Sequence, residues 1–573
     1  MILLRHKVFA TALSGSVFFT LICHAAAPTV AVAASAESGK GNASGLTDQT
    51  LYQYLISEIA GQRGRTGLAL RGMVDLAQRT RDPRVARRAV EIAFQARQMD
   101  AALEATSFWL ELEPDSIVAR QAMTAIASNQ GTLEAAKVSL AGLLAQPKRT
   151  AGVLMQLSGL LARFADKPAV AMTVAELVKP YLAFPEAHFA IAQANFVAKD
   201  GKASLAALEE TERRRPGWAP AAILKSQILA ETSEDRAGTF LKQFLTTYPA
   251  ASEVRVVYAR LLAAQKNYEP AREEFRTALK SKPDDAEIIY AIGLLSQQIG
   301  DYADADSQFK RVVELKPGDP GPVYFNLGTV AEARKLPEEA INWYGQVKDG
   351  DYFVNAQLKI AGILARRDGM AVGRKFLADA QVAQADAPET RIQLILAEAQ
   401  LLRDAKAFNA AFDALSDAIS KNPGTADLLY DRAMVAEKID KLDVMEADLR
   451  KVIELKPDQA HAYNALGYTF AERNTRLDEA YTLLQKAVSI SPNDAFIQDS
   501  MGWVQFRSGR VDDALATLKK AYQSRRDPEI AAHLGEVMWV RGERAEALKL
   551  WQAAQIENPD NDSLKTVMSK FKP

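Results

Sequence analysis

Prolines recur along the middle and the C-terminal half of the chain at the spacing of a helical hairpin. Pro249, Pro283 and Pro317 follow one another at intervals of 34 residues, and 34 residues also separate Pro423 from Pro457. Each interval has room for two helices of about three turns and the short loops that join them. A period of this kind predicts stacked hairpins that grow by addition, so the 573 residues do not require several globular domains.

The residues between two such prolines carry the pattern of a packed helix pair. In segment 286–317, AEIIYAIGLLSQQIGDYADADSQFKRVVELKP, Gly293 lies near the middle of the first expected helix and a Gly-Asp turn follows it. Ala305, Phe309 and Val312 are spaced to form one apolar stripe on the second expected helix. We therefore predict that the small residue of the first helix lets the second helix approach closely.

Three segments, 324–347, 463–488 and 500–522, resemble the tetratricopeptide repeat pattern of W-x2-L-G-x2-Y, A-x3-F and a closing proline. This resemblance implies an all-α fold, a right-handed superhelical solenoid of helix hairpins. Roughly fifteen hairpins are expected between about residue 47 and residue 560. In such a solenoid the first helix of each hairpin is expected to line a concave groove.

We divide the chain by how well this pattern is kept. The expected parts are a signal peptide at 1–33, a flexible tether at 34–47, degenerate repeats at 48–249, repeats at 250–350, degenerate repeats at 351–422, C-terminal repeats at 423–560 and a cap at 561–573.

The first residues read as a secretory leader. Arg5 and Lys7 precede an uncharged apolar run at 8–22, and small-x-small sites follow at 31–33 and 34–36. The run has 15 residues, fewer than the ~20 that span a membrane comfortably. We therefore expect export to the periplasm.

Cys23 is the only cysteine, and it ends that apolar run. It could accept a lipid, but Ile22 is larger than the small residue that lipidation signals place before their cysteine. We favour cleavage near Ala33 or Ala36, which would leave a chain without disulfides or thiol chemistry.

The composition argues against nucleic-acid binding and catalysis. Lys and Arg total 70 against 71 Asp and Glu, whereas nucleic-acid binders usually carry a strongly basic domain. HExxH, GxSxG and phosphate-binding GxxxxGK[ST] motifs are missing. His188, His461 and His533 fall in different repeats. We predict no enzymatic activity, no cofactor and no metal.

A basic stretch at 79–97 offers the first candidate protein-binding surface. Arg84, Arg87 and Arg88 are spaced to share one helical face. They could form a docking patch for a protein or anion, or an ordinary solvated face.

Aromatic and charged residues of the expected first helices offer a second candidate surface. Trp343 and Trp551, on second helices, are instead expected in the core. His533 and Glu536 have the spacing of half a di-metal site, but no third ligand is near, so we interpret them as partner-contacting residues. The alternative is that these side chains only pack on the next repeat. The candidates are Tyr430, Tyr468, Trp503, Phe506, Arg507, His533, Glu536 and Trp539.

Segments 51–97 and 499–551 also resemble a narrower proteobacterial family of periplasmic tetratricopeptide adaptors. Its known member is an outer-membrane lipoprotein that brings peptidoglycan hydrolases to a carboxy-terminal processing protease. The resemblance implies a non-catalytic adaptor with these partners and an association with the outer membrane. The alternative is a scaffold for envelope polysaccharide or secretion machinery. The oligomeric state is not predicted.

Overall fold

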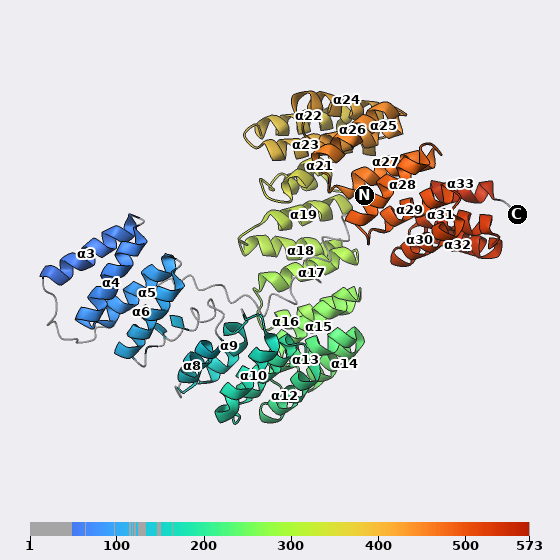
Figure 1. Ribbon diagram of the computed structural model, residues 1–573. Coiled ribbons are helices and arrows are strands. Elements are labelled where there is room, and N and C mark those ends of the chain that lie inside the picture. Colours follow the sequence, from blue (N-terminus) through green and yellow to red (C-terminus); the bar gives the residue numbers. More distant parts are fainter. Residues whose placement is uncertain are drawn as a thin grey trace. The chain divides into compact units, whose positions relative to one another are not determined.

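The structure, a computed structural model, describes residues 48–571 except 64, 97, 114–115, 117, 120–121, 124–132, 146–149 and 163 (Figure 1). These residues form thirty α-helices and one short 3-10 helix, and no strand occurs among them. The predicted leader, Cys23 and tether lie outside the described residues. None of the helices described has the length and apolar character needed to cross a membrane.

The chain divides into two compact units, of which the first ends at Leu315 and the second begins at Lys316. The helices of the first unit are α3 (Asp48–Gln62), α4 (Thr66–Thr80), α5 (Pro83–Gln95), α6 (Met99–Leu112), α8 (Leu133–Leu144), α9 (Thr150–Leu160), α10 (Lys167–Val178), the 3-10 helix η2 (Lys179–Tyr181), α11 (Pro185–Val197), α12 (Gly201–Arg214), α13 (Ala219–Thr232), α14 (Glu234–Thr247), α15 (Ser252–Ala264), α16 (Tyr268–Leu279), α17 (Ala286–Gln298) and α18 (Tyr302–Glu314).

The helices of the second unit are α19 (Gly321–Ala333), α20 (Pro337–Tyr344), α21 (Phe353–Asp368), α22 (Met370–Ala383), α23 (Pro388–Asp404), α24 (Phe408–Lys421), α25 (Ala426–Lys438), α26 (Leu442–Leu455), α27 (Ala460–Glu472), α28 (Leu477–Ile490), α29 (Ala495–Arg507), α30 (Val511–Ser524), α31 (Pro528–Arg541), α32 (Arg544–Glu557) and α33 (Asp562–Lys570). The boundaries predicted from pattern quality, such as 249/250 and 422/423, remain predictions.

From α11 to α18 in the first unit, and from α19 to α32 in the second, neighbouring helices pack in pairs, and within each unit each pair stacks on the next. The predicted all-α solenoid of helix hairpins is therefore confirmed in each unit. A glycine at the middle of several first helices sets the distance within the pair. A Cβ atom added at Gly293 would lie 2.6 Å from the ring of Phe309, and one at Gly328 would lie 2.5 Å from the ring of Tyr344. The predicted stripe of Ala305, Phe309 and Val312 is buried.

The two tryptophans predicted in the core differ. Trp551 is completely buried, as expected. Trp343 is only half-buried and stacks on Tyr324, so that prediction is wrong. The adjacent Tyr344 occupies the core position instead, because it follows the buried Ala340 by four residues, as Phe309 follows Ala305. Its hydroxyl donates to Glu332 at 2.7 Å, which satisfies its only polar group.

The turn between the two helices of a pair uses one left-handed residue. In α17, Gly300 has φ 83°, and the N–H of Asp301 donates to the carbonyl of Ser296 at 2.8 Å. This is the Schellman end of a helix, which normally favours glycine. Where the structure describes every residue of the turn, nine first helices end this way, yet only three of them use glycine there. The nine residues are Lys199, Lys266, Gly300, Lys335, Lys406, Asp440, Asn474, Gly509 and Gly542.

Candidate protein-binding surfaces

The first helices α27, α29 and α31 bring His533 into the centre of an aromatic cluster in the second unit. Nδ1 of His533 lies 2.9 and 3.1 Å from the two carboxylate oxygens of Asp499. The imidazole stacks on the indole of Trp503, with ring centroids 4.2 Å apart, and the ring of Tyr468 lies 6.2 Å away. Three successive repeats thus meet around one side chain.

Trp503 extends this cluster toward α27. Only 4% of Trp503 is exposed, and its indole N–H donates to Glu472 at 2.7 Å. The ring of Phe506 lies 5.4 Å from the indole, and the Arg507 guanidinium lies 5.7 Å from it. The structure therefore brings together five of the predicted residues, and in Trp503 it favours the alternative reading, packing on the next repeat.

The cluster is strongly acidic. Burial raises the pKa of the Tyr468 hydroxyl, and Glu472, Asp499, Glu529 and Glu437 raise it further. These four carboxylates come from α27, α29, α31 and α25, respectively. Negative charge from four successive first helices thus converges near Tyr468.

Glu536 and Trp539 contact the C-terminal segment, whereas His533 contacts α29. The Lys570 ammonium donates to Glu536 at 2.7 Å, and the ring of Phe571 lies 5.7 Å from the ring of Trp539. Both residues therefore contact the C-terminal segment with α33, and their role in binding a partner stays a prediction. Within the described residues, no group of three or more potential ligands is placed to hold a metal ion.

Tyr430 lies on α25 and packs against the large core cluster that contains Leu429, Ala433 and Met445. Burial raises the pKa of its hydroxyl, and Asp431 raises it further. A role for Tyr430 and the other seven residues in binding a partner stays a prediction.

The three arginines predicted to share a face are largely held by nearby carboxylates. Arg84 binds Asp82, the residue that caps the start of α5, at 2.7 Å. Arg87 binds Glu91 at 3.1 Å, and Arg88 forks onto Glu58 of α3 at 2.6 and 2.8 Å. Local ion pairs thus neutralise much of the expected basic patch, whose role in docking stays a prediction.

A surface that the sequence analysis missed lies on α3, at the outer edge of the group formed by α3–α6 (Figure 1). Five large apolar side chains are exposed there and define what we name the α3 apolar face; they are Leu51 (48%), Tyr52 (67%), Leu55 (49%), Ile56 (42%) and Ile59 (46%). Contiguous apolar surface of this kind usually marks an interaction site.

Small residues on the other side of α3 explain why the large ones face outward. Ser57 and Ala60 are buried, and a Cβ added at Gly72 of α4 would lie 2.2 Å from the Ser57 hydroxyl. Gln53 fixes the rotation of the helix by donating to Asp75 at 2.7 Å. The outward orientation of the α3 apolar face is thus a consequence of how the helix packs.

Three arginines lie where α3 leads into α4. Arg63, Arg65 and Arg71 are exposed, and none of them takes part in an ion pair found among the described residues. The α3 apolar face is therefore followed by uncompensated positive charge. The sequence feature that indicates this surface is a set of large apolar residues at positions i, i+1, i+4, i+5 and i+8 of one helix, with small residues on the opposite side.

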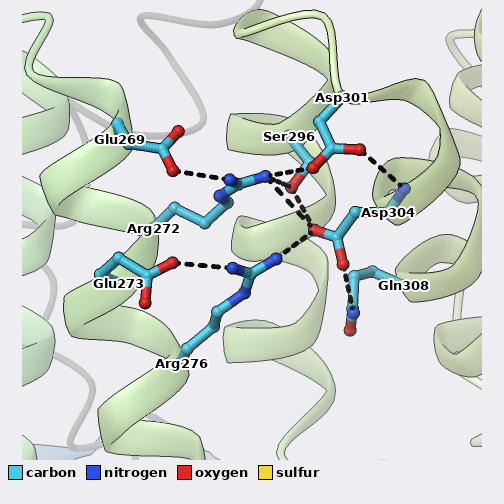
Figure 2. Close-up of polar contacts among 8 residues, drawn as sticks. All are labelled: Glu269, Arg272, Glu273, Arg276, Ser296, Asp301, Asp304 and Gln308. Atoms are coloured by element: carbon cyan, nitrogen blue, oxygen red, sulfur yellow. Dashed lines mark hydrogen bonds and ion pairs between the residues drawn. The ribbon is translucent and has the colours of Figure 1, made fainter.

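Figure 2 shows a polar network that joins α16 to the next hairpin in the first unit. Arg272, whose side chain is 7% exposed, donates to Glu269, Ser296 and Asp301 at 2.7, 3.2 and 2.8 Å. The Arg272 guanidinium and the backbone N–H of Asp304 hold the pKa of Asp301 below its usual value. Because Asp301 also caps α18, this network serves to join repeats.

Within the same network, Arg276 binds Asp304 at 3.0 Å and Glu273 at 2.7 Å. Gln308 donates to Asp304 at 3.0 Å. Every carboxylate drawn in Figure 2 accepts from an arginine, so none of them is left as a free general base.

The structure consists of stacked helix hairpins that contact one another through their first helices and carry exposed apolar surface. These features define the class of helical-repeat scaffold proteins, which are generally non-catalytic and bind other proteins. The sequence profile of the tetratricopeptide repeat matches residues 229–295, 286–319, 426–459, 460–494 and 500–562. A TPR repeat-containing protein of Pseudomonas aeruginosa, PA4667, is 32% identical over 493 residues, which are 86% of this chain and 82% of that protein. The chain belongs to the tetratricopeptide repeat family.

Two further similarities are more limited. Cellulose synthase operon protein C of Salmonella typhimurium is 29% identical over 188 residues, which are 31% of this chain and 15% of that protein. The solved structure of TTC0263, a thermophilic TPR protein of Thermus thermophilus, has 23% identity and a TM-score of 0.29, and covers 31% of this chain and 97% of its own.

Proposed function

We propose that this chain is a non-catalytic periplasmic adaptor that joins a carboxy-terminal processing protease to peptidoglycan hydrolases at the outer membrane. Membership of the tetratricopeptide repeat family supports the scaffold role. The leader pattern at 1–33 supports export, and the resemblance of 51–97 and 499–551 to periplasmic adaptors supports these partners.

The observation that carries the proposal is the α3 apolar face. Tyr52, Leu55, Ile56 and Ile59 have the i, i+3, i+4, i+7 spacing by which an amphipathic helix lies in an apolar groove of a partner. The preceding segment 34–47 is small and polar, so it has little apolar surface with which to cover this face. We assign the α3 apolar face to binding of the protease.

The charge beside this face indicates the chemistry of the partner's groove. Arg63, Arg65 and Arg71 have no ion-pair partner among the described residues, so a groove rimmed by carboxylates at that end would complement them. Such rim charges chiefly increase the association rate, so binding should weaken as salt concentration rises.

The test is a binding titration between the purified chain and the processing protease, combined with an assay of hydrolase degradation. The double variant Tyr52→Ser/Ile56→Ser should bind the protease about 10–100-fold more weakly, because two exposed anchors lose apolar contact. Degradation of the hydrolase should slow in parallel. Both side chains are exposed, so folding should be unchanged.

The matched control is Val382→Ser/Ile556→Ser, which removes two apolar side chains on α22 and α32 that are more exposed than Tyr52 and Ile56. The control should bind like the wild type. Equal affinity of the α3 variant and the wild type would contradict the assignment of α3, and no binding of the protease by the wild type would contradict the adaptor role.

A second candidate function is a scaffold for assembly of envelope polysaccharide. The similarity over 188 residues to a protein named for a cellulose synthase operon favours it. Under this alternative, deletion of the chain would reduce surface polymer and leave the amounts of wall hydrolases unchanged. Under the adaptor proposal, the same deletion would raise the amounts of the hydrolases.

A further inference from the structure

The junction between the last two hairpins contains a titratable side chain, His533, at the centre of its polar contacts. Asp499 of α29 is buried and His533 of α31 is partly buried, with side chains 8% and 15% exposed, and Nδ1 of His533 lies 2.9 Å from the Asp499 carboxylate. The imidazole also stacks on Trp503 of α29 at an interplanar angle of 22°. We name these three residues the His533 clasp.

The charge on His533 decides how strong this contact is. When the ring is protonated, Nδ1–H donates to a carboxylate, and the cation lies over an indole face, an attractive arrangement. When the ring is neutral, the ion pair and the cation–π attraction are both lost. The ring is the basic group closest to this carboxylate, so its deprotonation leaves Asp499 without charge compensation in a site of low exposure.

The groups that act on this charge come from three helices. Asp499 lies on α29, Glu472 and the neutral Tyr468 lie on α27, and Glu529 lies on α31 itself. Glu472 accepts from the uncharged indole N–H of Trp503, so its negative charge is not cancelled. A neutral His533 would therefore sit among three carboxylates, which repel one another.

We propose that protonation of His533 clamps α31 onto α29, and that loss of this proton as pH rises loosens the C-terminal end of the repeat array. The device couples the pH around the protein to the packing of its last hairpin. It does not depend on the identity of any partner.

The direction of the effect follows from linkage. Burial lowers the pKa of His533, but Asp499, Glu472 and Glu529 raise it by more, so its pKa in the folded protein lies above the ordinary 6.5. A raised pKa contributes stability that is fully present below pH 6.5 and is lost as pH rises through the folded value. Each unit of difference between the folded and the ordinary pKa of His533 changes the equilibrium constant for opening of the last hairpin tenfold.

The other histidines of the folded part provide controls. His461 is exposed on α27, and His188 contacts a backbone carbonyl, that of Leu182, at 3.0 Å instead of a carboxylate. Replacement of His461 by glutamine should therefore leave the behaviour of the last hairpin unchanged.

The test is hydrogen exchange of α31 and α32 amides in the full chain at about pH 6 and about pH 9, corrected for intrinsic exchange rates. In the wild type and in His461→Gln, protection of α31 should fall at the higher pH. The fall should be tenfold for each unit by which the pKa of His533 in the folded protein exceeds its ordinary value. In His533→Gln and in Asp499→Asn, protection should be low at both pH values.

A second measurement follows the Cε1–H resonance of His533 by NMR in the folded wild type, with the His533→Gln spectrum providing its assignment. The expected titration midpoint is above 6.5. A midpoint at or below this value would overturn the proposal. So would equal protection of α31 at both pH values in the wild type, or an unchanged pH dependence in His533→Gln.

Discussion

Replacement of Gly535 by alanine tests the packing rule that several hairpins share. Gly535 lies in the middle of α31, and an added Cβ would be 2.1 Å from Nε1 and 2.4 Å from Cε2 of Trp551. The indole cannot easily move away. Trp551 is completely buried, donates to the carbonyl of Ala532 at 3.3 Å and packs against the rings of Trp539 and Phe571, each 5.9 Å away.

Two opposing terms set the expected magnitude. Alanine in place of glycine favours a helix interior by about 1 kcal/mol. Overpacking of a close-packed site costs about 1–3 kcal/mol, and the upper end applies because the ring must move by about 1 Å to reach ordinary contact. Weakening of the indole hydrogen bond adds about 1 kcal/mol. We expect a net loss of about 3 kcal/mol in the stability of the last hairpin.

The assay is hydrogen exchange of α31 and α32, since a long repeat array need not unfold in one step. Gly362→Ala is the matched control. Gly362 also lies inside a helix, α21, but the nearest atom to its added Cβ is the end of the Arg366 side chain at 3.6 Å. The control should gain about 1 kcal/mol from helix propensity alone. If Gly535→Ala were as well protected as the wild type, the close approach of Trp551 would not be what requires glycine.

Three further predictions concern single contacts in the second unit. Lys335→Gly should raise stability by about 0.5–1 kcal/mol in chemical denaturation, because Lys335 has φ 61° and glycine removes the left-handed strain. Asp448→Asn should lower stability by about 3 kcal/mol in the same assay. Two nitrogens of the Arg432 guanidinium each donate to the buried Asp448 carboxylate at 2.8 Å, and the substitution leaves this guanidinium without its counter-charge. The Arg476 guanidinium lowers the pKa of Glu446 to about 2, so the stability that Glu446 contributes above pH 4.5 should be lost as pH falls toward 2. Glu446→Gln should flatten this part of an acid denaturation curve, and an unchanged curve would contradict the assignment.

The hairpin itself was predictable because its determinants are local. Gly293 and the stripe of Phe309 and Val312 lie within one 34-residue period, and helix geometry alone places them opposite each other. The choice between Trp343 and Tyr344 follows from the same local pattern. Tyr344 lies four residues after Ala340, at the Phe position of A-x3-F, and both residues are buried, whereas Trp343 lies one position earlier and is only half-buried.

The turns were harder to recognise. Lys266, Lys335 and Lys406 adopt the left-handed conformation that sequence rules assign to glycine. The packing of the two helices on each other holds these residues in place despite the local cost.

Contacts between the first helices of successive repeats depend on which of their residues lie side by side, and the tertiary structure shows which these are. Asp499 and His533 are 34 residues apart, and so are Glu536 and Lys570. Residues one period apart on first helices are therefore neighbours, and a search for complementary pairs at this separation could have found both contacts.

By itself, the sequence determined the class of fold and the family, since a 34-residue period with glycine, alanine and proline at regular places can bury its apolar stripes only by stacking hairpins. Only the tertiary structure decided which surfaces remain available. Trp503 and Trp539 occupy positions that the repeat pattern assigns to the groove. The next repeat contacts Trp503, and the C-terminal segment contacts Trp539. The large apolar residues of α3 have the spacing of a core face, yet they are exposed, because the small residues Ser57 and Ala60 form the side of α3 that packs against α4. Burial depends on which neighbour lies against a face, and that neighbour is set by packing between helices far beyond any local pattern.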